Sequence, residues 1–186
     1  GGTAGQGFNG GQAGTAWGGT GGGGGASSVG VSGVSNTSWS DNLGRGGTGM
    51  VASIISDANA ASAGIGERAS NPYNSFRTII GGNDFSGGAG GRRSNNDDRS
   101  RSGTGGAGGG RGNYARYAFQ FPNSGGGAQA NGATDRSGSG GVVVIRYPST
   151  FFATISGATE APNSPFTDGT DKITVIKGGS GTITFS

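Results

Sequence analysis

Residues 138–148 read GSGGVVVIRYP and pass from glycine into a run of β-branched residues that stops at a proline. β-Branched side chains favour extended backbone, and proline cannot donate to a strand ladder. The stretch therefore predicts a β-strand over 142–147. FFATI at 151–155 is a candidate for a further strand or for a plug at the end of the first one.

The end of the chain, KITVIKGGSGTITFS at 172–186, has alternating side chains on both sides of a glycine-rich stretch. Alternation on either side of glycine is typical of a hairpin, here with its turn at 178–181. A small antiparallel β segment is therefore expected over 142–186.

Upstream of that segment the composition changes abruptly. Of the 47 glycines among 186 residues, 20 fall in 1–50, two in 51–80, 20 in 81–141 and five in 142–186. Hydrophobic residues make up 30% of the chain, too few for an ordinary packed core, so order must come largely from the backbone. We expect a glycine-rich domain over 1–141, with an insert of normal composition at 51–80, followed by the β segment.

The first glycine zone has a period of three. Every third position carries nothing larger than a methyl group: Gly1, Ala4, Gly7, Gly10, Ala13, Ala16, Gly19, Gly22 and Gly25. Three residues per turn is the period of an extended polyproline II type of helix, and strict Gly-X-Y, which collagen needs, is missing. Two interpretations stay open: a flexible disordered chain, or polyglycine-II-like extended helices packed side by side through backbone hydrogen bonds. The expected fold class is mostly β and irregular, with such helices, the small β segment and one short helix.

The short helix is expected in the insert. Residues 50–63 read MVASIISDANAASA, with apolar residues at helical spacing, and Gly64 is a suitable stop. Beyond it, the turn signal Asn71-Pro72 precedes a possible strand over 76–80.

Composition removes many kinds of chemistry. The chain has no Cys and no His, which excludes thiol and imidazole catalysis, disulfides and the commonest transition-metal ligands, so we expect neither an enzyme nor a cofactor. The net charge of +3 arises at low charge density and does not demand nucleic acid. No apolar run approaches the roughly 20 residues of a membrane span, so no membrane insertion is expected. GGNDF at 81–85 is one imperfect copy of a calcium repeat, and Asp97-Asp98 lie among arginines as a self-neutralising loop.

The exit motif at 138–147 and the segment DGTDKITVIKGGSGTITFS at 168–186 resemble the glycine-rich domains of bacteriophage tail-fibre and tail-associated proteins. The glycine runs are more loosely similar to the tip adhesins of T-even-type phages, whose polyglycine helices stack in a lattice. The resemblance implies a non-enzymatic virion structural or adhesin domain, extracellular on the tail fibre. Its implied partners are other copies or other fibre chains, and a host surface polysaccharide or outer-membrane protein. A hydrophobic entry strand before Gly1 is missing, so a fragment, an oligomer and an external neighbour for strand 142–147 are expected.

The candidate receptor-binding residues lie between the glycine runs, where loops carry recognition. They are Trp39, Tyr73, Phe76, Tyr114 and Tyr117. Core packing is an equally good explanation for each. The alternative function is a glycine-rich disordered segment of an RNA-binding or extracellular-matrix protein, suggested by GGGRGNYARYAFQF at 108–121.

Overall fold

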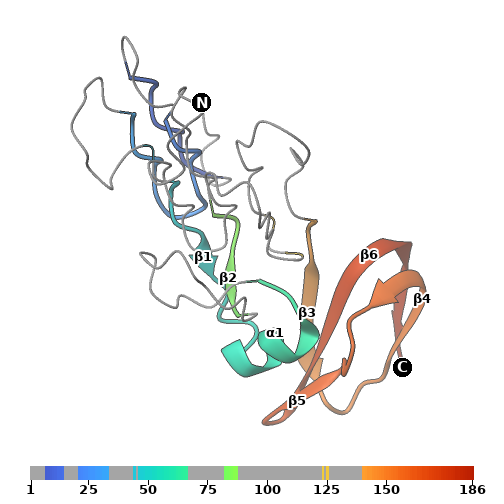
Figure 1. The fold of residues 1–186 in the computed structure, drawn as a ribbon. Helices are drawn as coiled ribbons and strands as arrows, with labels where there is room; N and C mark the ends of the chain where they lie inside the picture. The colour runs from blue at the N-terminus through green and yellow to red at the C-terminus, as the bar shows by residue number, and fades with distance from the viewer. Residues whose placement is uncertain are drawn as a thin grey trace.

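The computed structural model of the chain describes residues 7–14, 21–33, 44, 46–66, 82–87, 123, 125 and 140–186. Strands and irregular segments dominate them, with one short helix, as the composition predicts (Figure 1). The elements are β1 (Met50–Val51), α1 (Asp57–Ala63), β2 (Asp84–Phe85), β3 (Val143–Pro148), β4 (Ala153–Glu160), β5 (Phe166–Asp168) and β6 (Asp171–Phe185). The possible strand over 76–80 lies outside the described residues.

The larger sheet is built around β6, which pairs antiparallel with every other strand in it. β3 lies along one edge of the first half of β6, from Pro148 opposite Asp171 to Val143 opposite Ile176. The predicted strand over 142–147 is thus confirmed, shifted by one residue. Its neighbour comes from within the same chain, so it does not need an external strand as its neighbour.

The predicted hairpin over 172–186 is wrong, because β6 is a single strand of 15 residues. β4 pairs with it on both sides of the glycine-rich stretch, from Glu160 opposite Ile176 to Ala153 opposite Phe185, with shifts of register in between. Gly157 and Gly179 take φ values of 82° and 83° at these shifts. Positive φ at glycine is how a β-bulge bends a strand, so the glycines bend β6 and β4 together instead of reversing the chain.

The bend brings the two ends of β6 to the same side of the sheet. Tyr147 lies opposite Lys172, near the start of β6, yet its ring is 5.1 Å from that of Phe185 at the other end. Figure 1 shows β6 rising from beside β5 and turning over, so that the C-terminus comes down beside β4. The hydroxyl groups of Tyr147 and Thr174, both buried, are 3.0 Å apart under this folded layer. The second half of the ribbon therefore covers one face of the first.

The other face of the sheet is covered by α1, which is shorter than predicted. It begins after Ser56, whose hydroxyl oxygen accepts a hydrogen bond from the backbone amide of Asn59, and ends at Gly64 with φ 64°. Gly64 is thus confirmed as the stop, but Met50–Val51 form β1 instead of a first helical turn. β1 pairs with β2, and this pairing requires an extended backbone at Met50 and Val51, which a helix would exclude.

The hydrophobic core lies between α1 and β6. Its buried members are Ile55, Ala60, Ala63, Ile65, Ala161, Phe166, Ile173 and Val175. Lys177 adds a polar contact, since its Nζ donates to the carbonyl oxygens of Ala63 (3.2 Å) and Gly64 (3.3 Å) at the helix C-terminus, where a cation is favourable. The core thus joins the insert to the β segment.

Four glycine-rich runs form the other part of the described chain: run 1 (7–14), run 2 (21–25), run 3 (28–33) and run 4 (46–49). They belong to neither helix nor strand. Backbone amides nevertheless join runs 1, 2 and 3 pairwise. The bonds go from Phe8 to Gly25 (3.0 Å), Gly11 to Gly22 (2.7 Å), Gly22 to Val31 (3.0 Å), Gly25 to Ser28 (2.9 Å), Gly30 to Asn9 (3.0 Å) and Gly33 to Gln12 (2.8 Å). In each pair of runs, donors and acceptors recur at an interval of three residues.

The five consecutive glycines of run 2 lie where these runs meet. A Cβ built on Gly21 or Gly24 would overlap the carbonyl groups of run 1, and one on Gly25 those of run 4. Run 2 therefore has room for backbone alone on those sides, which explains the glycines at positions 21, 24 and 25.

Candidate functional site

All five predicted receptor-binding residues, Trp39, Tyr73, Phe76, Tyr114 and Tyr117, lie outside the described residues. The structure therefore does not test whether these five residues form one site. What it does describe is the scaffold from which one of these segments departs. Residues 34–43, which contain Trp39, follow directly on run 3.

The order of the backbone bonds fixes how the runs are directed. Run 3 is parallel to run 1, because Gly30 bonds to Asn9 and Gly33 to Gln12, and run 2 is antiparallel to both. The last residue of run 1, the first of run 2 and the last of run 3 therefore share one end of the bundle, here called the distal end. The chain leaves it through 15–20 and 34–43, and each of these segments contains one of the two tryptophans.

The distal end is held by a side chain as well as by the backbone. The backbone amide of Gln12 donates to Oγ of Ser32 (3.0 Å). The carbonyl of Gln12 accepts from the backbone amide of the next residue, Gly33 (2.8 Å). Gln12, Val31 and Ser32 are exposed there. The described residues next to the departing segments are thus uncharged and expose an amide, a hydroxyl and an apolar side chain.

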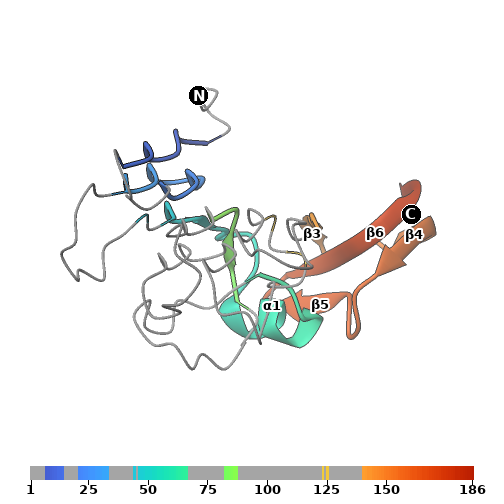
Figure 2. The ribbon, with the colours of Figure 1, turned by 45° about the horizontal axis from the view of Figure 1, so that its top comes forward.

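The opposite end of the bundle is fixed to the smaller sheet by hydroxyl groups that the sequence analysis missed. Oγ of Ser27 lies 2.9 Å from Oγ1 of Thr48 and donates to the carbonyl of Gly49 (2.6 Å), and the amide of Thr48 donates to Oγ of Ser28 (2.8 Å). The amide of Ala26 adds a bond to the carbonyl of Ser86 (2.9 Å), directly after β2. Figure 2 shows runs 1 to 3 projecting away from α1 and the larger sheet. A serine pair directly after GGGGGA was the available sequence signal for this turn.

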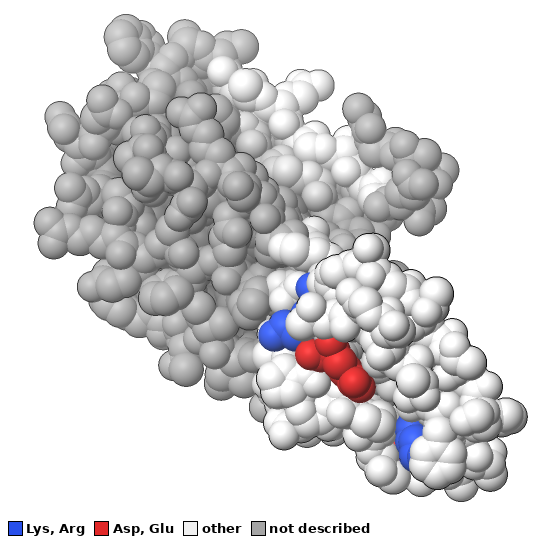
Figure 3. Space-filling model, turned by 90° about the vertical axis from the view of Figure 1, so that its right-hand side faces the viewer, with Lys and Arg blue, Asp and Glu red and all other residues white. Residues whose placement is uncertain are grey.

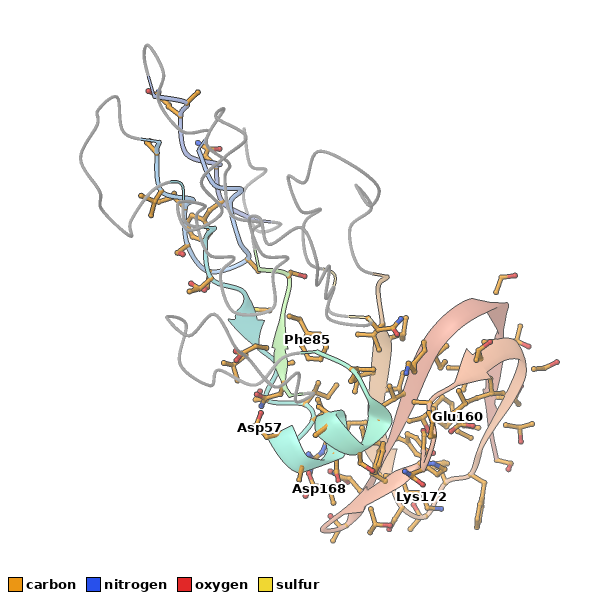
Figure 4. The ribbon with its side chains drawn as sticks, in the orientation of Figure 1. Asp57, Phe85, Glu160, Asp168 and Lys172 are labelled. Carbon is orange, nitrogen blue, oxygen red and sulfur yellow. The ribbon has the colours of Figure 1, made fainter. Side chains whose placement is uncertain are left out.

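Cations of the larger sheet already have partners. Arg146 forms ion pairs with Asp168 and Asp171, each at 2.7 Å. The hydrogen bond to Asp171, with further help from Asp168, raises the pKa of Arg146 above its ordinary value. Nζ of Lys172 lies 4.0 Å from the ring centroid of Phe152 and donates to the carbonyl of Phe151 (3.2 Å). Figure 4 labels Asp168 and Lys172 at the lower part of this sheet, far from the glycine runs. These contacts connect turns to strands, so Arg146 and Lys172 have a structural role.

The calcium-like motif at 81–85 ends in a strand, because its last two residues form β2. Asp84 is buried in β2, opposite Val51, and the backbone amide of the neighbouring Asn83 donates to Oδ1 of Asp57 (3.1 Å). No cluster of three potential metal ligands occurs among the described residues. The described part of the chain also contains no helix long and apolar enough to cross a membrane. Asp97, Asp98 and the arginine–glycine segment at 108–121 lie outside it.

Comparison with known proteins gives no relative: no family model, no curated protein and no solved structure matches the chain.

Proposed function

We propose that the chain is a non-enzymatic structural or adhesin domain of a phage tail fibre, in which a glycine lattice presents loops for attachment to the host surface. The observation that carries the proposal is the set of backbone bonds joining runs 1, 2 and 3 at intervals of three residues. Such a bundle needs no large side chains for its own cohesion. It therefore leaves the connecting segments free to carry recognition residues.

The runs themselves are proposed to be polyglycine-II-like extended helices. An extended helix with three residues per turn directs every third amide to the same side, which accounts for the interval of the bonds. Each run among the first three bonds to both of the others, so the arrangement extends in two directions as a lattice does. The close contacts at Gly21, Gly24 and Gly25 account for the lack of side chains at these positions of run 2.

Recognition is assigned to the segments between runs, with Trp39, Tyr73, Phe76, Tyr114 and Tyr117 as candidates. Aromatic rings offer a large contact area at low entropic cost, which suits a polysaccharide or an outer-membrane protein. In this proposal the domain is extracellular on the virion and works by adhesion, together with other copies or other fibre chains.

The test is adsorption to host cells of particles that carry the chain. The triple variant Trp39→Ala, Tyr73→Ala, Tyr117→Ala is expected to adsorb less than the parent. Phe8→Ala is the matched control, because Phe8 is an exposed aromatic residue on run 1 that contributes its backbone amide to the lattice. Unchanged adsorption of the triple variant, with particles intact, would reduce the role to a purely structural one in the virion.

The disordered RNA-binding or matrix segment makes the opposite prediction for the backbone. A disordered glycine chain exchanges all its amide hydrogens rapidly, whereas the lattice protects the bonded ones. Uniformly fast exchange through 7–33 would favour that alternative and reject the adhesin scaffold.

A further inference from the structure

One edge of the larger sheet changes its surroundings halfway along β6. β3 occupies this edge as far as Ile176. There Nδ2 of Asn123 donates to the carbonyl oxygens of Gly141 and Lys177, both at 2.9 Å, and so marks the place where the two backbones separate. Beyond it β6 continues to Phe185 with β4 on its other edge. Among the described residues no strand pairs with the edge of β6 over 178–185, here called the open edge.

The open edge lacks the usual protection against pairing. Natural edge strands are guarded by charged side chains, proline or short length. Residues 178–186 read GGSGTITFS, with no charged residue and no proline, and most of them are exposed. The charged residues of 140–186 all lie elsewhere, at Arg146, Glu160, Asp168, Asp171, Lys172 and Lys177. Figure 3 shows the right-hand side of the view in Figure 1, and blue and red atoms take up a small part of its described surface.

The remaining edges of the sheet are shorter or carry some of this protection. β3 contains Arg146 and ends at Pro148, and β5 has three residues. β4 has its one charged residue, Glu160, at its end, with Pro162 just beyond, and its uncharged part over 153–159 is shorter than the open edge. The open edge is the longest unguarded one in this part of the chain.

We propose that the open edge pairs antiparallel with the open edge of a second copy of this chain. A twofold axis makes a surface meet itself, and an uncharged strand does so without repulsion between like charges. Cross-strand threonine pairs, which Thr182 and Thr184 would form, are favourable. The second half of the sheet is a two-stranded ribbon, and a third and fourth strand from the pairing would stabilise it. The pairing does not depend on whether the domain binds a receptor.

The test uses two variants of the full chain that differ in the strand carrying the new charges. Thr182 lies opposite Ser156 and Thr184 opposite Thr154, and all four are exposed. Residues directly opposite each other point to the same face of a sheet, so T182K/T184K and T154K/S156K add equal charge to the same face. Sedimentation equilibrium measures the dimer dissociation constant, and circular dichroism checks that each variant is folded.

The parent is expected to dimerise, and T182K/T184K should raise the dissociation constant about ten-fold or more, because the lysines of the two copies would lie on adjacent strands. T154K/S156K keeps its lysines one strand further from the axis on each copy and should change the constant much less. A parent that stays monomeric overturns the proposal. So does a dimer that both variants leave intact, or one that T154K/S156K alone disrupts, since another surface would then hold the copies together.

Discussion

A single methyl group at Gly24 would collide with the carbonyl of Phe8, whereas one at Gly10 would lie 3.2 Å from the carbonyl oxygen of Gly22. The period of three includes Gly10, but Gly24 and Gly11, which lie outside that period, have tighter contacts, and a Cβ on Gly11 would overlap Val31. The reason is that the space at a glycine depends on whether its Cβ would point at the carbonyl groups of a neighbouring run, as it would at Gly11 and Gly24.

Gly24→Ala is therefore expected to destabilise the bundle by about 2 kcal/mol, the usual size of an overpacking defect. Slow amide exchange at Phe8 and Gly11 should be lost in this variant. Gly141→Ala is the control, because a Cβ there meets nothing within 4 Å, and its effect should stay within about 0.5 kcal/mol. Equal stability of the two variants would contradict the packing of runs 1 and 2.

A second residue-scale prediction concerns the hydroxyl pair under the folded ribbon. Tyr147→Phe leaves the buried hydroxyl of Thr174 without this partner, so we expect a loss of about 1–2 kcal/mol in the free energy of unfolding. Thr174→Val added to it should cost less than the two single changes together, because the orphaned group is then removed. Chemical denaturation of the four proteins in the cycle measures this, and strict additivity would speak against the bond.

At the scale of the element, the bend of β6 depends on neighbouring glycines with different requirements. Gly179 has φ 83° and a Cβ on it would lie 3.0 Å from the carbonyl oxygen of Gly157, whereas Gly178 has open space. Gly179→Ala should cost about 1–2 kcal/mol, since alanine disfavours positive φ, and should weaken the near-ultraviolet signal of Tyr147 beside Phe185. Gly178→Ala should leave both stability and signal close to those of the parent. Equal stability and equal near-ultraviolet signal in the two variants would contradict the bend at Gly179.

At the scale of the whole molecule, the chain combines two kinds of cohesion. The sheet and α1 share a hydrophobic core, while runs 1 to 3 are joined by backbone bonds. Hydrogen exchange followed by NMR should therefore show two patterns. Protection is expected at an interval of three amides between the runs, at Gly22 and Gly25 for example. In β6 it is expected at consecutive amides, at Lys172 and Ile173, which lie between β3 and β5. Protection at alternate amides within the runs would indicate ordinary strands.

Local sequence signals predicted the elements whose causes are local. β-Branched residues before Pro148 predicted β3, and Gly64 predicted the end of α1, because both depend on the backbone preferences of the residues concerned. The start of α1 was missed because β2, more than 30 residues further on, offers Met50 and Val51 a strand partner. Of the candidate site, the sequence supplied Trp39 and the other aromatic residues, and they stay predictions.

The sequence by itself determined that the chain has a glycine-rich part and a short β part, since composition and β-branched runs limit what each segment can bury or extend. Tertiary structure alone decided whether GGSG at 178–181 reverses the chain or bends it. Glycine permits both conformations, and the chain bends because β4 pairs with β6 on either side of these glycines. It also decided which glycines have no room for a Cβ, because that depends on the carbonyl groups of neighbouring runs and not on the period along one run.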